Sequence, residues 1–240
     1  VDRQIHDNPS LLHVFSAGNS NNQNCGYGAG NQWGNITGGH KMGKNTVTVA
    51  NLFSDGALVN SSSRGPANDG RIKPDLAAHG QGQPSTDPNN GYQSFGGTSA
   101  AAPTSAGSFA QLYQAYREMH SGAFPPSALI KALMLNTADD YGNPGPDFRF
   151  GWGRVNAYRA LLSLEAGQYL VDSIAQADTN LHSITVPSGV TELRVMVYWN
   201  DPEASPAAAR ALVNNLDMVL DDGSAQSLPL VLDPTPNPAT

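Results

Sequence analysis

The segment that most constrains the fold is residues 95–107, FGGTSAAAPTSAG, where two glycines precede a serine and small residues follow it. Glycine tolerates positive φ values, so the two glycines can make a tight turn. The small residues after the turn allow a helix to lie close against a sheet, and Phe109 and Leu112 continue an apolar face at helical spacing. The pattern predicts a turn followed by a helix that runs from Ser99 to about His120.

Ser99 has two interpretations in this setting. At a helix N-terminus, free N–H groups and the helix dipole favour negative charge, which suits a nucleophile whose reaction develops an oxyanion. The alternative is a structural turn into a close-packed helix, with no chemistry attached to the serine. The local pattern by itself favours the structural interpretation.

Two apolar runs before this helix predict buried strands of a parallel sheet. Residues 11–15, LLHVF, form the first run, and residues 46–50, TVTVA, which are rich in β-branched side chains, form the second. Asn19 follows the first strand. An asparagine at such a position is usually a turn residue, and the functional alternative is an amide that faces developing negative charge.

Helical patterns lie on both sides of these strands along the chain. We expect helices at residues 1–8, from residue 125 onward and at residues 157–165, and a polar loop at residues 81–93. Helices and buried strands are thus both expected in this part of the chain.

The character of the chain changes after Gly167. Residues 169–174, 181–186 and 193–199 are short, strand-like and separated by turn residues, and the sequence DDGS at residues 221–224 predicts a hairpin. We therefore place a domain boundary near residues 165–168. Residues 1–166 are predicted to form the first domain, and residues 167–240 are predicted to be part of an all-β sandwich of the jelly-roll kind.

Composition excludes several classes of partner. The net charge is −7 and no basic run is present, which argues against nucleic acid and anionic membrane surfaces. No apolar run approaches the roughly 18 residues of a membrane-spanning helix. Cys25 is the only cysteine, so an intrachain disulfide is impossible. These features are compatible with secretion.

Three segments together resemble the subtilisin-like serine proteases, or subtilases. The nucleophile motif of that family, Gly-Thr-Ser-x-Ala-x-Pro, is matched by residues 97–103, GTSAAAP. Its oxyanion-hole segment resembles residues 16–19, SAGN, and a segment found between the two in many members resembles residues 62–66, SSRGP, with residues 71–76, RIKPDL. The order and rough spacing of the segments also agree with the family.

The second region has its own counterpart. Residues 151–156 (GWGRVN), 197–202 (VYWNDP) and 212–217 (LVNNLD) resemble alkaline subtilases that carry a C-terminal β-barrel or jelly-roll domain. The resemblance therefore extends to about residue 222.

The resemblance implies a subtilisin-like three-layer α/β fold with a mostly parallel sheet, and a serine endopeptidase that hydrolyses polypeptides through an acyl-enzyme. Ser99 would be the nucleophile, and the Asn19 side chain and the Ser99 N–H would form the oxyanion hole. The family also implies an extracellular or cell-surface location and no cofactor for catalysis. The residues implied to contact substrate are Ser16, Ala17, Gly18, Gly97 and Thr98.

The departures from the family concern the proton acceptor. The sequence contains no Asp-Ser/Thr-Gly segment and no His-Gly-Thr-His segment, the places where the family carries its catalytic Asp and His. We therefore expect this chain to be the C-terminal half of a catalytic domain that needs a missing N-terminal half. A serine without its base is not an activated nucleophile, so the isolated chain is expected to be inactive. The six histidines lie in other contexts: His6, His13, His40, His79, His120 and His182.

Other functions stay open at this stage. The chain could be a non-catalytic binding or structural relative that keeps the fold, or a subtilase used as a peptide ligase or maturation protease. A structural calcium ion is possible at Asp201, Asn214 and Asp217, because carboxylate and amide oxygens suit a hard cation. A network of β-turns uses the same residue types and is the favoured interpretation of these three.

Overall fold

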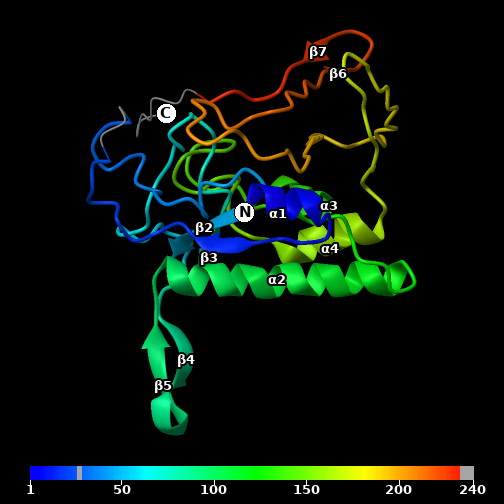
Figure 1. The fold of residues 1–240 in the computed structure, drawn as a ribbon. Coiled ribbons are helices and arrows are strands. Elements are labelled where there is room, and N and C mark those ends of the chain that lie inside the picture. Colours follow the sequence, from blue (N-terminus) through cyan, green and yellow to red (C-terminus); the bar gives the residue numbers. More distant parts are fainter. Residues whose placement is uncertain (26–28, 233–240) are drawn as a thin grey trace.

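A computed structural model describes residues 1–25 and 29–232 of the chain (Figure 1). The helices and strands, in order, are α1 (Asp2–Asp7), β1 (Val14–Ser16), β2 (Val47–Leu52), β3 (Leu76–His79), β4 (Gln83–Asp87), β5 (Gly91–Phe95), α2 (Thr98–Met119), α3 (Ser127–Asn136), α4 (Ala157–Glu165), β6 (Leu220–Asp221) and β7 (Gln226–Ser227). A single 3₁₀ turn, Pro88–Asn90, joins β4 to β5.

The centre of the fold is a parallel sheet with the strand order β1-β2-β3. Every residue of β2 is buried, as the β-branched run in its sequence predicts. Of the apolar run at residues 11–15, Val14 and Phe15 pair with β2, and the His13 carbonyl accepts from the Val47 N–H at 2.9 Å. The α/β fold with a parallel sheet, predicted from sequence, is therefore confirmed.

Helix α2 packs across all three strands of this sheet (Figure 1). Its first turns carry Ala100, Ala101 and Ala102, which are buried, so the helix axis can approach the sheet closely. Gly80 serves the same contact, since a Cβ there would lie 2.4 Å from the Ala101 nitrogen. Although α2 spans 22 residues, it is too polar to cross a membrane, and no other described helix qualifies.

A buried ionic cluster lies between the sheet and α3. The Asp75 carboxylate contacts the Lys73 ammonium at 2.5 Å and the Lys131 ammonium at 2.9 Å, and all three side chains are less than 10% exposed. The Thr48 N–H also donates to this carboxylate, at 2.7 Å. Burial alone would raise the pKa of Asp75, but Lys131 and Lys73 lower it further than burial raises it, so the carboxylate stays ionised.

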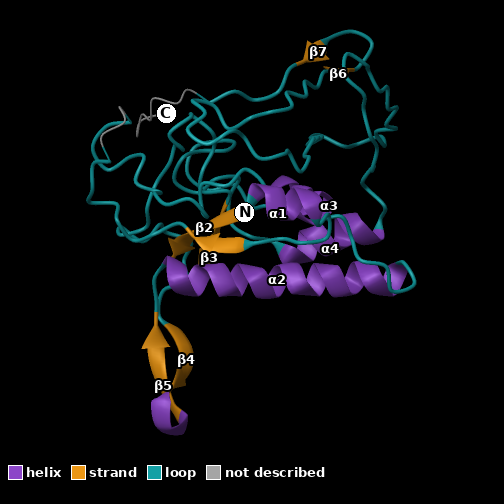
Figure 2. Cartoon of the chain, viewed as in Figure 1, coloured by secondary structure: helices purple, strands orange, loops and turns teal. Residues whose placement is uncertain are grey.

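Residues 81–93, predicted to be a polar loop, instead form most of an antiparallel hairpin. Strands β4 and β5 pair from Gln83 opposite Phe95 to Asp87 opposite Gly91. The hairpin projects from the body beside the N-terminus of α2 (Figure 2). Neither face of it is buried, so it lacks the alternation of apolar and polar residues by which strands are predicted.

The strands predicted at residues 169–174, 181–186 and 193–199 are a second correction. The structure assigns no strand to these segments. Their backbones find no neighbouring strand to pair with, and apolar side chains such as Leu181, at 92% exposure, stay in solvent. The hairpin predicted at residues 221–224 does form, between β6 and β7. A sandwich domain for residues 167–240 stays a prediction.

The ionic cluster yields a stability prediction. Asp75→Asn should lower the free energy of unfolding by about 3–5 kcal/mol, because it leaves two buried ammonium groups without a counter-charge. Urea denaturation followed by circular dichroism measures this. The control is Asp87→Asn in the exposed hairpin, which should change stability by less than about 0.5 kcal/mol. Equal midpoints for the two variants would show that the cluster does not hold the fold together.

Candidate active site

Ser99 lies exposed at the second position of α2, immediately after the turn that the two glycines make. Gly97 adopts φ 92° and ψ 177°, a region that residues with a Cβ rarely enter. A Cβ on Gly97 would also lie 3.2 Å from the Asn19 side-chain nitrogen. Glycine at this position therefore gives both the turn and the close approach of residue 19.

Thr98 joins the serine segment to the segment that follows β1. Its backbone N–H and its hydroxyl donate to Asn19 Oδ1, at 3.1 and 3.2 Å, and its hydroxyl accepts from the Gly18 N–H at 3.1 Å. A backbone N–H can only donate, so the oxygen of the Asn19 amide must face Thr98 and the NH₂ group must point away from it. No acceptor for this NH₂ group lies among the described residues.

The first turn of α2 leaves a second donor without a partner. The N–H groups of Ala100 and Ala101 donate to the Gly97 carbonyl, and the Thr98 N–H is taken by Asn19. Within the described residues the Ser99 N–H has no acceptor, as expected of an early position in a helix. The exposed Ser99 hydroxyl is therefore accompanied by two free donors, its own N–H and the Asn19 amide.

The remaining predicted substrate residues lie where the chain leaves the carboxyl end of β1. Ser16 ends the strand, the buried Ala17 donates its N–H to the Val49 carbonyl at 3.0 Å, and Gly18 turns the chain with φ 111°. The structure thus brings together all seven predicted site residues, which are Ser16, Ala17, Gly18 and Asn19 from one segment and Gly97, Thr98 and Ser99 from the other.

The SSRGP segment supports the loop after β1. The Ser63 N–H donates to the Gly18 carbonyl at 2.8 Å, and the Ser63 hydroxyl accepts from the Ser20 N–H at 3.1 Å. These two bonds flank Asn19 on both sides. Ser63 therefore holds the backbone of Asn19 while Thr98 holds its side chain.

A cavity of about 250 Å³ lies beside this loop, and sequence reasoning missed the part that residues 38–41 play in it. Phe15, Ser16 and residues 38–41 line it. Lys41 reaches toward Gly18, since a Cβ on Gly18 would lie 2.9 Å from the Lys41 Nζ. The sequence signal that could have indicated it is a lysine in a glycine-rich loop with no acidic residue nearby in the chain.

No imidazole contacts Ser99 in the part of the chain that the structure describes. The ring of His79 is engaged on both sides, by the Gln81 carbonyl at 3.0 Å and by the Gln83 side chain at 2.9 Å. The His13 ring contacts the Gln4 side chain at 2.9 Å. His40 lies at the rim of the cavity, with its ring centroid 5.6 Å from that of Phe15.

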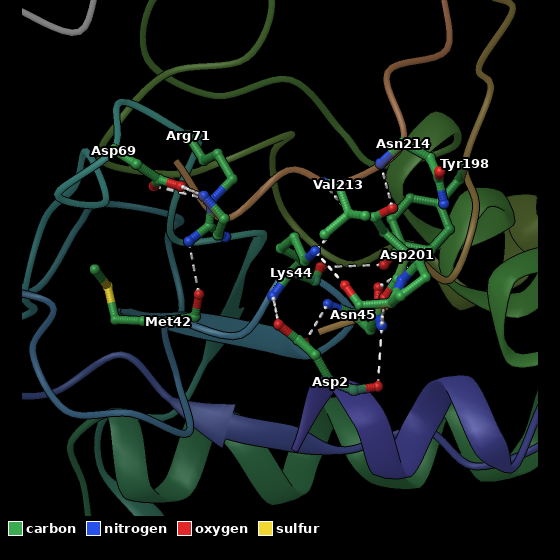
Figure 3. A network of polar contacts seen from close by, with 12 residues as sticks. Asp2, Met42, Lys44, Asn45, Asp69, Arg71, Tyr198, Asp201, Val213 and Asn214 are labelled. Atoms are coloured by element: carbon green, nitrogen blue, oxygen red, sulfur yellow. Dashed lines mark hydrogen bonds and ion pairs between the residues drawn. The ribbon is translucent and has the colours of Figure 1, made fainter. Parts of the chain in front are cut away.

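Of the three residues considered for calcium, Asp201 and the Asn214 backbone belong to a polar network (Figure 3), whereas the Asp217 carboxylate lies 3.5 Å from the Asn215 side-chain nitrogen. The buried Asp201 carboxylate contacts the Lys44 ammonium and accepts from the N–H groups of Val213 and Asn214, each at 2.8 Å. A cation at the Asp201 carboxylate would have to displace Lys44, so the Asp201 oxygens do not fit Ca²⁺ in this arrangement. Across the described residues, no group of three or more His, Cys, Asp or Glu side chains suits a metal. Structural calcium stays a prediction.

The sequence of this chain is similar to those of known proteins. Residues 1–153 match the model of the subtilase family. The serine protease/ABC transporter B family protein tagA of Dictyostelium discoideum is 29% identical over 210 residues, which cover 72% of this chain and 12% of that protein. An extracellular serine protease of Serratia marcescens is 33% identical over 171 residues, covering 62% of this chain and 15% of that protein.

Solved structures agree on the fold. The prenylagaramide maturation protease PagA superimposes with a TM-score of 0.54 at 21% identity, over 67% of this chain and 53% of that one. A lanthipeptide protease gives the same TM-score at 22% identity. This chain therefore spans about half of each of these structures, and much less of the curated relatives.

The glycine turn can be tested directly. Gly97→Ala should lower the free energy of unfolding by about 1–3 kcal/mol, because alanine is strained at this φ and ψ and its Cβ approaches the Asn19 amide. The matched control is Gly107→Ala in the same helix. A Cβ at Gly107 meets nothing within 4 Å, so that change should be neutral or stabilising by up to about 1 kcal/mol. Urea unfolding measures the free energy of unfolding of both variants. Equal changes in this free energy would contradict a conformational requirement at Gly97.

Proposed function

This chain belongs to the subtilase family, and on that basis we propose that it carries the nucleophile and the oxyanion hole of a serine endopeptidase. The observation that carries the proposal is the group of three features at the start of α2. Ser99 is exposed, and Thr98 holds the oxygen of the Asn19 amide, so that neither the Ser99 N–H nor the Asn19 NH₂ group has an acceptor among the described residues.

The chemistry follows from these positions. The Ser99 Oγ bonds to the carbonyl carbon of the scissile peptide while a base takes the hydroxyl proton. The carbonyl oxygen becomes an oxyanion, which accepts hydrogen bonds from the Asn19 Nδ2 and the Ser99 N–H. Breakage of the C–N bond returns the proton to the leaving amine and leaves an ester on Ser99, which water then hydrolyses. Because both donors are fixed before the reaction, they need no reorganisation as the charge develops.

The base is proposed to come from outside these 240 residues. No histidine of the described chain contacts Ser99, and a serine needs an adjacent base to act as a nucleophile. That the chain spans about half of the similar solved structures is compatible with a second part of the domain supplying it. The substrates are proposed to be polypeptides, and the site of action extracellular, as the name of the Serratia relative states for that protein.

Active-site labelling tests the nucleophile. A fluorophosphonate probe should label the full-length protein that contains this chain, and Ser99→Ala should abolish the labelling. The isolated 240-residue chain should not be labelled, because its serine has no base. Ser108→Ala, in the same helix, is the matched control and should be labelled like the wild type.

Labelling that survives Ser99→Ala would disprove the assignment of the nucleophile. Ser99-dependent labelling of the isolated chain would disprove the need for an external base. Mass spectrometry of peptide products separates hydrolysis from ligation, since only ligation joins the acyl fragment to an added amine.

The oxyanion role of Asn19 makes a kinetic prediction. Asn19→Asp keeps an oxygen to accept from Thr98 but replaces the NH₂ donors, so kcat in the full-length protein should fall at least about 10²–10³-fold with little change in KM. That range is known from loss of one oxyanion-hole donor in a protease of this family. Thermal unfolding checks that the variant is folded. A kcat within threefold of wild type would contradict the role.

A further inference from the structure

Lys41 is the one lysine of this chain whose charge the described structure leaves unmatched. Each of the others is paired with an aspartate: Lys44 with Asp201, and Lys73 and Lys131 with Asp75. Among the described residues, the Lys41 ammonium has neither an ion pair nor a hydrogen bond, and only its backbone carbonyl is bonded, to the Thr48 hydroxyl at 2.6 Å. The usual reason for placing a lysine in a partly buried position is therefore missing here.

The position of Lys41 makes its unpaired charge unfavourable. The side chain is half-buried, and this burial lowers the pKa of the ammonium group. A cation that loses water and gains no partner is destabilising, unless a ligand provides the counter-charge. The cavity of about 250 Å³ beside it is open to solvent and can admit such a ligand.

The position of the ammonium relates it to Ser99. Lys41 Nζ lies 2.9 Å from the point where a Cβ on Gly18 would be, and Gly18 precedes Asn19 and donates its N–H to Thr98 at 3.1 Å. In a peptide whose scissile carbonyl meets the Asn19 amide and the Ser99 N–H, the side chain of that same residue is attached to the Cα that is bonded to the carbonyl carbon. Ser16, which lies three residues before Asn19 in the same segment, lines the cavity together with Lys41.

We propose that Lys41 is a specificity-determining residue that binds the carboxylate of an aspartate or glutamate placed immediately before the scissile bond. The proposal rests on the proposed endopeptidase function and adds the class of substrate. One ammonium group suits a single carboxylate, with the aliphatic stem of the substrate side chain against Phe15. The other lining residues, Ser16, Gly38, Gly39 and His40, carry no carboxylate that would compete for the ammonium. Since the chain as a whole has a net charge of −7, this local positive charge is a feature of the cavity and not of the surface in general.

Cleavage of matched peptides by the full-length protein tests the proposal. Four peptides differ only in the residue before the scissile bond, which is Glu, Gln, Leu or Lys. The wild type should prefer Glu over Gln by roughly tenfold to hundredfold in kcat/KM, the range of one hydrogen bond to a charged group. Lys41→Met should bring that ratio close to one, Lys41→Arg should retain most of it, and Lys41→Glu should favour the Lys peptide. Arg210→Gln, which removes an exposed positive charge elsewhere, should leave the ratio unchanged.

Binding separates a failure of this proposal from a failure of the proposed function. Fluorescence anisotropy with Ser99→Ala protein measures the affinity of the same peptides without cleavage, and the Glu peptide should bind more tightly than the Gln peptide only when Lys41 is present. If the wild type cleaves peptides with a Glu-to-Gln ratio near one, or the ratio survives Lys41→Met, Lys41 does not select substrate. If nothing is cleaved but the Lys41-dependent difference in affinity persists, the carboxylate site stands and the endopeptidase function falls.

Discussion

The contact on which the rest of this structure depends is the buried carboxylate of Asp75 between two ammonium groups. Asp75 precedes β3, its oxygen accepts from Thr48 in β2, and Lys131 brings α3 to the same point. Lys131 also donates to the Thr46 carbonyl at 2.7 Å and lies 4.7 Å from the centre of the Tyr198 ring. One charge therefore sets the relative positions of two strands, a helix and a distant segment, and each partner is needed because an unpaired charge at this depth is costly.

The positions of the site residues depend on that arrangement through strand pairing and hydrogen bonds. With β2 and β3 in place, β1 pairs along β2, and its carboxyl end delivers residues 16–19 to the N-terminus of α2. Ser63 then holds the backbone on both sides of Asn19, and Thr98 orients its amide. The reactive groups lie at the carboxyl ends of parallel strands, where open α/β sheets usually place their ligands.

Sequence reasoning succeeded where the signals are local. Helix α4 begins and ends where its pattern predicts, since the Asn156 side chain caps it by accepting from the Arg159 N–H at 3.0 Å. The seven site residues came from motifs that resemble one family, and the fold brings them together. Prediction from the sequence failed where the structure of a segment depends on a neighbour far along the chain. The β4–β5 hairpin has no buried face to give it a pattern, and the strand-like segments after residue 167 find no partner strand in the described part of the chain. Nor does the sequence show that Lys41 is the lysine without an aspartate partner among the described residues.

The hairpin of β4 and β5 has a wider consequence. It stands out from the body of the molecule, and none of its residues belongs to the buried apolar clusters of the described chain (Figure 1). Its sequence can therefore drift at little cost in stability. Yet its second strand runs through Gly96 and Gly97 straight into Ser99. A segment that can vary in sequence and is joined closely to the exposed serine allows related chains to diverge in the ligands they prefer, while the core beneath stays unchanged.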